Sequence, residues 1–301
     1  MNVEQLIEKA RKLVDSFRVT SSKRFRLRNI DPGDTLGIGS EEKSRAKEAL
    51  TYGIETLAAL QDKLYAQDKW AALVVLQGLD AGGKDGVIKH VMSGVNPQGC
   101  QVHSFKSPSA EDLDHDYLWR YIKCLPNRGH IGIFNRSYYE ETLVVRVHPE
   151  ILAKQRIPSP LVTKNIWKER FHDIRAFEAY LSRNGIVPMK FFLHLSKGEQ
   201  RRRLLERIEM PEKNWKFSAS DMAERARWDD YQEAFEDMIR NTATKECPWY
   251  VVPADNKWFA HGIVAAAIIE RLGSLDLAYP RVDKVKLREI AGAKRALLKA
   301  K

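Results

Sequence analysis

One short segment of the sequence combines glycines, a lysine and a carboxylate at a spacing that suits phosphate chemistry. Residues 78–84 read Gly-Leu-Asp-Ala-Gly-Gly-Lys and follow the apolar run 71–76. In such a Gly-x-x-x-x-Gly-Lys loop the backbone N–H groups converge on phosphate oxygens, and the lysine reaches the group that is transferred. A helix beginning near Lys84 would point the positive end of its dipole at the same place. The candidate phosphate-binding residues here are Gly78, Ala81, Gly82, Gly83, Lys84, Asp85 and Gly86.

The loop departs from the common form in two ways. Asp85 stands where a serine or threonine usually follows the lysine, so the usual hydroxyl ligand for magnesium is missing. Asp80 puts a second carboxylate inside the loop, where a polyanion would repel it unless a cation lay between them. We therefore predict that Asp80 binds Mg²⁺, directly or through water. The alternative is a chance match in a strand–turn–helix unit, but apolar residues at helical spacing continue after the loop.

A second apolar segment, residues 131–134, ends in Asn135 and Arg136. The corresponding strand of a nucleotide site normally ends in an acid that helps to hold magnesium, and here a neutral oxygen donor takes its place. The Arg136 guanidinium can make a bidentate contact with phosphate. Taken alone, the pair would better fit a structural turn at a strand end. With the phosphate loop in the same sheet, we expect both residues to act at the site.

Basic residues are concentrated between residues 196 and 231. Two helices joined by a turn-like segment would form a lid at about 200–228, which closes over phosphates and excludes water. Arg203 and Arg207 share one helix face and could clamp a phosphate chain, and Lys216 follows in the same lid. The alternative is a solvated helix, because acids are interleaved with these bases. A weaker group of candidates for contact with an acceptor comprises Lys106, His115, Asp116 and Arg120.

From residue 70 onward, apolar strands alternate with helical patterns. This alternation favours an α/β fold of three layers, with a parallel sheet between helices and a helical lid. Ligands of such sheets bind beyond the carboxyl ends of the strands, where the phosphate loop lies. The predicted strands cover 71–77, 100–105, 130–134, 187–195 and 249–252, and the predicted helices lie near 2–16, 41–67, 84–94, 110–124, 161–183, 197–209, 219–241 and 257–272.

The net charge of +10 is concentrated at the two ends of the 301-residue chain. Residues 1–31 carry +4 and residues 281–301 carry +6, so the body between them is neutral. Basic ends could contact a polyanion or a nucleic acid, or be solvated arms. Apolar residues in the tail favour an amphipathic helix docked on another subunit, and we expect a homo-oligomer. We divide the chain into a basic N-terminal extension (1–40), one P-loop domain (41–275) and a basic tail (276–301).

The composition favours a cytoplasmic protein. No stretch approaches the roughly 20 apolar residues of a membrane span, and the N-terminus lacks an apolar signal core. The three cysteines are odd in number and form no metal-type pair, which suits reduced thiols. We expect no membrane partner.

Several motifs in the same order resemble the polyphosphate kinase 2 family across roughly residues 40–275. They lie at residues 77–86, 96–99, 134–137, 211–217 and 248–250. The resemblance implies a P-loop kinase-like fold and catalytic roles for Asp80, Lys84, Asn135 and Arg136. It also implies Mg²⁺-dependent, reversible transfer of a phosphoryl group from inorganic polyphosphate to a nucleoside mono- or diphosphate, AMP to ADP and ADP to ATP. Adenine nucleotides are the expected acceptors, and guanine nucleotides are left open.

The residue at position 135 bears on the acceptor. In the family that this chain resembles, members with Asp in the place of Asn135 use mainly nucleoside diphosphates. With Asn at this position, the chain is similar to the branch that accepts nucleoside monophosphates, some members of which accept both. Residues 84–86 and 96–100 are similar to this dual-acceptor branch. We therefore expect both AMP and ADP as acceptors.

Two other functions are weighed against this one. An ordinary ATP-dependent nucleotide or small-molecule kinase with the same fold would prefer ATP as donor and would not respond to polyphosphate chain length. A nucleic-acid-binding protein would use the basic ends and would bind in a salt-sensitive way without Lys84. The neutral body and the lack of a basic stripe rich in aromatic residues count against nucleic acid.

Overall fold

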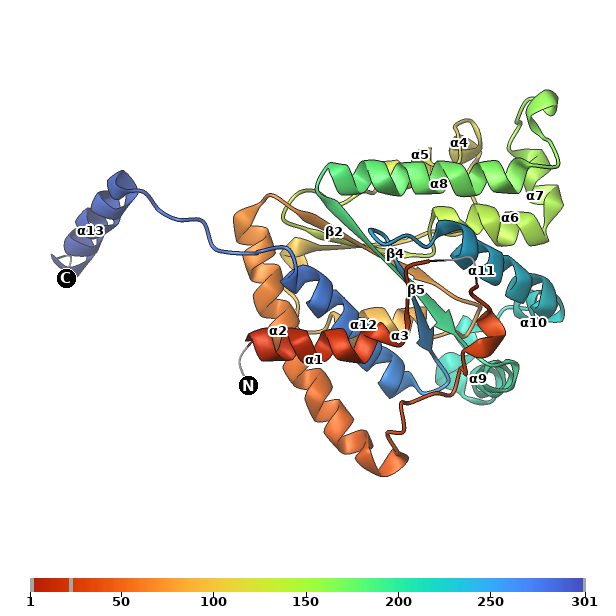
Figure 1. The fold of residues 1–301 in the computed structure, drawn as a ribbon, viewed down its shortest axis with the longest axis horizontal. Helices are drawn as coiled ribbons and strands as arrows, with labels where there is room; N and C mark the ends of the chain where they lie inside the picture. The colour runs from red at the N-terminus through yellow and green to blue at the C-terminus, as the bar shows by residue number, and fades with distance from the viewer. Residues whose placement is uncertain (1–2, 22–23, 300–301) are drawn as a thin grey trace.

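A computed structural model describes residues 3–21 and 24–299, so residues 1, 2, 22, 23, 300 and 301 of the predicted terminal segments lie outside the description. Its strands form one six-stranded sheet in the order β1-β6-β5-β2-β4-β3 (Figure 1). Neighbouring strands are parallel, except that β1 runs antiparallel to β6. The strands are β1 (Arg18–Val19), β2 (Ala71–Gln77), β3 (Cys100–Ser104), β4 (Ile131–Asn135), β5 (Ile186–His194) and β6 (Trp249–Pro253).

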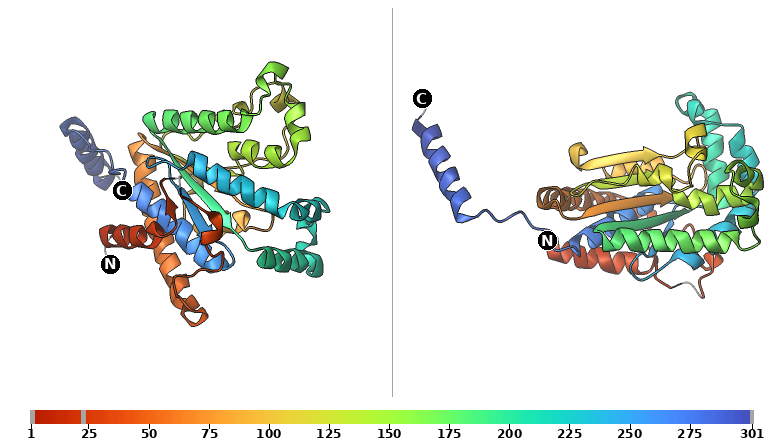
Figure 2. Two further views of the ribbon diagram at one scale, coloured as in Figure 1. Left: turned by 45° about the vertical axis from the view of Figure 1, so that its right-hand side comes forward. Right: turned by 90° about the horizontal axis from the view of Figure 1, so that it is seen from above.

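The sheet lies between two layers of helices, as the alternation of strands and helices predicts (Figure 2). Side chains along a strand point to opposite faces in turn. Val74 therefore belongs to one core, with residues of α1 (Val3–Asp15), α2 (Lys43–Gln67), α3 (Lys84–Val91) and α12 (Lys257–Gly273). Its neighbour Val75 belongs to the other, with residues of α5 (Trp119–Ile122), η4 (Tyr138–Thr142), α8 (Ile166–Arg183) and α11 (Trp228–Thr242). The three-layer α/β fold is confirmed.

The order of the strands fixes where a ligand can bind. From β2 the chain crosses to β3 at one edge of the sheet, returns to β4 beside β2, and then crosses to β5 on the other side of β2, so the order reverses at β2. Leu76 of β2 is in register with Asn135 of β4, which places the loop after β2 beside the end of β4. Open α/β sheets bind ligands at such a reversal, beyond the carboxyl ends of the strands. Above this edge lie the lid elements α9 (Lys197–Glu209), η6 (Pro211–Lys216) and α10 (Ser220–Ala226).

Some predicted elements were wrong in extent. The predicted helix at 110–124 is two short helices, α4 (Ala110–Leu113) and α5, because the Asp116 carboxylate accepts a hydrogen bond from the Leu118 N–H and forms a turn between them. The predicted helix at 219–241 is divided at Arg227 into α10 and α11. Prediction missed β1, α6 (Val144–Val147), α7 (Pro149–Lys154) and the 3₁₀ turns η1 (Leu27–Asn29), η2 (Ser40–Glu42), η3 (Pro97–Gly99), η4 and η5 (Ser159–Leu161).

The two ends of the chain differ in how they relate to the body. Helix α1 packs on α12, and Val14 and Phe17 are buried in the core. The tail forms the helix α13 (Lys284–Lys299), as predicted, but this helix stands apart from the body (Figure 1). The docking of α13 on another subunit stays a prediction. In the described part of the chain, no helix is both long and apolar enough to cross a membrane.

A charged network is buried in the second core. Lys190 of β5 is fully buried, and its Nζ lies 2.7 Å from Oε2 of Glu178 on α8. Oε1 of Glu178 accepts hydrogen bonds from the hydroxyls of Tyr138 at 2.9 Å and Tyr139 at 2.7 Å. Lys190 also donates to the carbonyl of Thr242 at 2.8 Å. These contacts tie η4, α8, β5 and α11 together behind the strand ends that carry the loop.

We predict that Lys190→Met lowers the free energy of unfolding by about 3–5 kcal/mol, because it leaves the Glu178 carboxylate charged and unpaired in the interior. Urea unfolding followed by circular dichroism measures the change. Lys286→Met, which breaks an exposed ion pair with Glu289, serves as the control and should change stability by less than about 0.5 kcal/mol. A loss below about 1 kcal/mol for Lys190→Met would show that the network is not needed for stability.

Candidate active site

The segment between β2 and α3 has the backbone conformation of a phosphate-binding loop. Ala81 and Gly83 adopt left-handed conformations, with φ of 63° and 101°. A Cβ atom at Gly82 would lie 2.8 Å from the carbonyl oxygen of Leu79, so only glycine fits there. Helix α3 begins at Lys84, and its first N–H groups face the loop. The structure thus forms the predicted loop where α3 presents its positive end.

Lys84 is buried beneath the loop. Its Nζ donates to the carbonyl oxygens of Gly78 at 2.6 Å and Leu79 at 3.2 Å. Burial, and then the charge of Arg136, lower the pKa of Lys84 from its ordinary value to about 8. The lysine is therefore held in position by the loop, and an incoming anion would favour its charged form.

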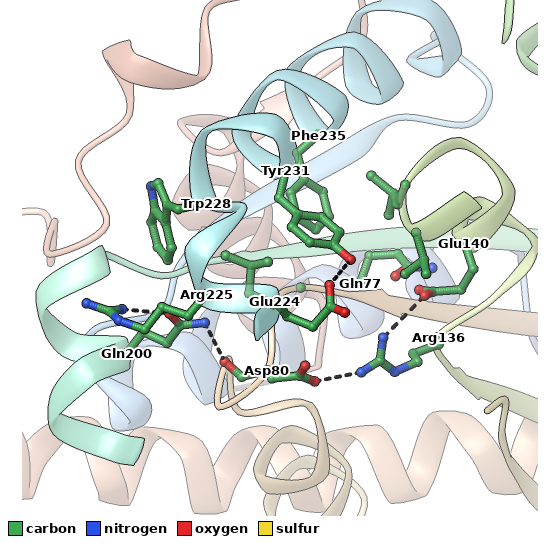
Figure 3. A pocket seen from close by; sticks show the side chains of 14 residues that line it. Gln77, Asp80, Arg136, Glu140, Gln200, Glu224, Arg225, Trp228, Tyr231 and Phe235 are labelled. Atoms are coloured by element: carbon green, nitrogen blue, oxygen red, sulfur yellow. Dashed lines mark hydrogen bonds and ion pairs between the residues drawn. The ribbon is translucent and has the colours of Figure 1, made fainter. Parts of the chain in front are cut away.

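Asp80 and Arg136 meet at the centre of the site (Figure 3). Oδ1 of Asp80 lies 2.6 Å from Nη2 of Arg136, and Nη1 of the same guanidinium donates to Glu140 at 3.2 Å. Glu140 foremost, and Asp80 with it, raise the pKa of Arg136, which keeps the guanidinium charged. The arginine joins the loop after β2 to the turn after β4. Its backbone is left-handed, with φ of 67°.

Asn135 and Asp85 form a second link between the same two segments. The Asn135 amide donates to Oδ1 of Asp85 at 2.8 Å. An aspartate at position 135 would instead place two carboxylates within hydrogen-bond distance. The neutral side chain therefore allows Asp85 to occupy the position where a serine or threonine is usual. The four predicted catalytic residues, Asp80, Lys84, Asn135 and Arg136, lie at one edge of the sheet, and their roles in the reaction stay predictions.

The residues around Asp80 fit a magnesium ion that is shared with a substrate. Among residues 3–21 and 24–299, no three His, Cys, Asp or Glu side chains are grouped so as to hold a metal ion. Asp80 is a single carboxylate, 29% exposed, at the mouth of the phosphate loop. Mg²⁺ is commonly held by one or two carboxylates together with substrate phosphates and water. Asp80 offers that kind of partial coordination, with the rest supplied by phosphate oxygens.

Two side chains of the lid helix α9 support the loop from behind. Gln200 donates to the carbonyl of Asp80 at 3.1 Å, and Arg203 donates to the carbonyl of Ala81 at 3.0 Å. Arg203 is 5% exposed and also donates to the carbonyls of Ala254 and Asp255 after β6. Most of its N–H groups are thus engaged by backbone oxygens. The structure gives Arg203 a loop-supporting role, and the predicted phosphate contact stays a prediction.

The other lid candidates lie farther from the loop carbonyls. Arg207 pairs with Asp221 of α10 at 3.1 Å. Burial, and then the charge of Asp80, raise the pKa of Asp221. Lys216 is exposed, and its Nζ lies 5.0 Å from the ring centroid of Trp215. Phosphate binding by Arg207 and Lys216 stays a prediction.

A cavity of about 420 Å³ opens beside the loop. Asp80 and Arg136 lie in its wall, and three of the four weaker candidates, Lys106, His115 and Arg120, line it as well. The fourth, Asp116, does not line it. The cavity is within the size range of small-molecule sites, and its lining includes both cationic side chains and carboxylates. The structure thus brings a phosphate loop and a space for a second substrate to the same carboxylate and guanidinium.

Several residues of the site could not be singled out from the sequence. Gln200 lies three residues before Arg203, and that spacing on the buried face of α9 is the one signal that could have found it. Arg225 of α10 donates to Oε1 of Gln200 at 2.7 Å, and the Tyr231 hydroxyl contacts Glu224 (Figure 3). The first contact joins residues 25 apart in sequence and the second joins residues seven apart across the break between α10 and α11, so no regular helical spacing indicates them.

The sequence matches one protein family over most of its length. The family model for Polyphosphate kinase 2 (PPK2) matches residues 40–277. The chain is 51% identical over 288 residues to the ADP-polyphosphate phosphotransferase of Rhodopseudomonas palustris, which covers 92% of this chain and 99% of that protein. It is 45% identical over 267 residues to the AMP/ADP-polyphosphate phosphotransferase of Meiothermus ruber, with 89% and 96% covered.

A solved structure gives the same result for the fold. The crystal structure of polyphosphate kinase 2 from Arthrobacter aurescens TC1 superposes with a TM-score of 0.84 at 36% sequence identity. The match covers 93% of this chain and 96% of that one. The P-loop kinase-like fold expected from the sequence is therefore confirmed.

We predict that Arg203→Met increases amide hydrogen exchange in residues 79–83 by about tenfold or more, because the loop carbonyl of Ala81 loses a charged donor. Exchange measured by mass spectrometry tests this. Arg202 is the matched control, since it lies on the exposed side of α9 and pairs with Glu199 and Glu206. Equal exchange in Arg203→Met and Arg202→Met would mean that α9 does not hold the loop.

Proposed function

Because the chain belongs to the polyphosphate kinase 2 family, we propose that it transfers a terminal phosphoryl group from inorganic polyphosphate to AMP and to ADP, reversibly and with Mg²⁺. The observation that carries the proposal is the meeting of Asp80 and Arg136 between the phosphate loop and the 420 Å³ cavity. An ATP-dependent kinase is not favoured, since the relatives are named as polyphosphate phosphotransferases. We further propose a homo-oligomer in the cytoplasm.

The donor end of a polyphosphate chain would lie on the loop. The first N–H groups of α3 and the ammonium of Lys84 face a phosphate there, and the Arg136 guanidinium can contact the transferred group. Mg²⁺ held by Asp80, when bound, would neutralise negative charge on the phosphate oxygens. Arg136 also contacts Glu140, so it keeps its position when it exchanges Asp80 for a phosphate.

The acceptor nucleotide would occupy the cavity. Its phosphate would approach Arg136 and Asn135 from the side of Lys106 and Arg120, which line the wall. The attacking oxygen belongs to a phosphate whose second ionisation near pH ~6 leaves it largely deprotonated, so no general base is needed. The protein then contributes neutralisation and in-line placement of the two phosphates, which is how phosphoryl transfer is generally catalysed.

Acceptance of both AMP and ADP is supported by two observations. Asn135 contacts Asp85 without adding a negative charge next to the acceptor phosphate. The relative from Meiothermus ruber is named for both nucleotides, whereas the relative from Rhodopseudomonas palustris is named for ADP alone. The two names leave the choice of acceptor to experiment.

We predict that purified protein incubated with polyphosphate, Mg²⁺ and AMP produces first ADP and then ATP. Chromatography of the reaction mixture measures both products. Asp80→Asn should lower kcat by roughly 10²-fold or more with the fold retained, because the loop loses its metal-binding carboxylate. Asp230→Asn, an exposed change on α11, serves as the control. Product from ADP only would remove AMP as an acceptor. Turnover with ATP but not with polyphosphate as donor would overturn the proposed function.

The pKa of Lys84 predicts how activity depends on pH. The ligand-free protein loses the Lys84 proton near pH 8, whereas a free lysine would keep it to higher pH. Because kcat/KM reports on the free enzyme, kcat/KM for polyphosphate should fall above about pH 8. A bound polyanion favours the charged lysine, so the fall in kcat should come at higher pH. A kcat/KM that is constant between about pH 7 and 9.5 would contradict this assignment.

A further inference from the structure

Helix α13 is an exposed basic helix outside the catalytic body. The family match ends at residue 277, and α13 begins at Lys284. No described residue of α13 is buried, and the helix stands off the body at the end of a linker (Figure 1). Helix α13 is therefore an addition to the catalytic fold, and we infer its role from its own side chains.

The charges of α13 form a row. Residues 284–299 contain six basic residues and one acid, a net charge of +5. In an α-helix of 3.6 residues per turn, Lys284, Arg288, Arg295 and Lys299 fall within about 60° of one face and span roughly 22 Å. Such a row can contact several charges of an extended polyanion at once.

These cations lack acidic partners, unlike those of the lid. In the described part of the chain, the ion pair of α13 is Lys286 with Glu289, which lies outside the row. Arg295 donates only to the carbonyl of Ala291 in its own helix. In the lid, by contrast, several bases pair with acids, for example Arg202 with Glu199, Arg207 with Asp221 and Lys213 with Glu206. Most of the +5 charge of α13 is therefore uncompensated, and a polyanion would gain from contact with it.

The distance between the phosphate loop and α13 determines how long a polyanion must be to contact both. Helix α12 starts next to α3, where Nε2 of His261 approaches Gly86, and its 17 residues extend about 25 Å away from the loop. After α12 the linker is held against α2, since Tyr279 donates to Asp62 and Gln67 donates to the carbonyl of Asp276. A chain of a few phosphates bound at the loop cannot reach α13, whereas a long chain can.

We propose that α13 binds the distal part of long polyphosphate chains through the row Lys284, Arg288, Arg295 and Lys299, and so raises the affinity for long donors. The inference rests on the proposed function, because it takes polyphosphate as the donor. Two contacts on one chain act together, since the second forms within a molecule already bound. The apolar residues of α13, such as Leu287 and Ile290, would also suit an anionic membrane, and this alternative enters the test.

The test replaces the row by glutamine, a good helix former, in the quadruple variant Lys284→Gln, Arg288→Gln, Arg295→Gln and Lys299→Gln. The matched control removes four exposed charges from the body, with Lys47→Gln, Arg175→Gln, Arg183→Gln and Lys245→Gln. Both variants lower the net charge equally, so a difference between them belongs to α13. KM is measured with chains of about 100 and about ten phosphates, at two salt concentrations.

The tail variant should raise KM for the long chain about tenfold and reduce its salt dependence by roughly two to three units of log–log slope. Its KM for the short chain and for AMP, and its kcat, should stay within about twofold. An equal effect of the control variant, or no change in the ratio of long-chain to short-chain KM, would overturn the proposal. Loss of binding to vesicles of anionic phospholipid, with KM unchanged, would assign α13 to a membrane instead.

A direct binding experiment distinguishes a failure of the proposed function from a failure of the proposal for α13. If the wild-type protein shows no turnover with either chain length, fluorescently labelled polyphosphate is titrated directly into the wild-type protein and both variants. Weaker binding of the long chain to the tail variant alone would still support the row on α13. Equal binding by all three proteins would overturn it.

Discussion

The ion pair between Asp80 and Arg136 is the contact on which the arrangement of the site depends. It joins the loop after β2 to the turn after β4 and pairs two charges to which the proposed function gives separate roles. Without substrate, the Asp80 carboxylate and the Arg136 guanidinium neutralise each other, so neither charge is left without a partner. A phosphate can replace the carboxylate on the arginine, and a cation can replace the arginine on the carboxylate. In the proposed reaction both side chains thus exchange partners, while Glu140 holds Arg136 in place and the loop holds Asp80.

Hydrogen bonds connect the helices of the lid to the phosphate loop. Gln200 and Arg203 of α9 hold consecutive carbonyls of the loop, and Arg225 of α10 holds Gln200 in turn. A displacement of α9 or α10 would therefore be felt at the backbone of Asp80. We expect closure over a substrate and the final shape of the loop to be coupled through these hydrogen bonds, of which the one from Arg203 to Ala81 is buried and the other two are partly buried.

The parts of the fold that sequence could predict are those governed by local patterns. The apolar runs of β2, β4 and β5 and the glycines before Lys84 can be recognised because each pattern is set by neighbours in the chain. The support of the loop by Gln200 and Arg203 depends on contacts across more than 100 residues, and no periodicity reports it. The break in the predicted helix at 110–124 had a local signal in Asp116, whose turn competes with the helix. The two-residue strand β1 is too short to leave a pattern.

The short strand β1 protects an edge of the sheet against association with other chains. Through Arg18 and Val19 it covers the outer side of β6, and the N–H of Val251 bonds to the carbonyl of Phe17. Without this segment β6 would be an open sheet edge of five buried, apolar or aromatic residues. Open edges of this kind pair with other chains and lead to aggregation. A chain trimmed to the family span of residues 40–277 would keep every residue proposed for catalysis and lose its protection against self-association.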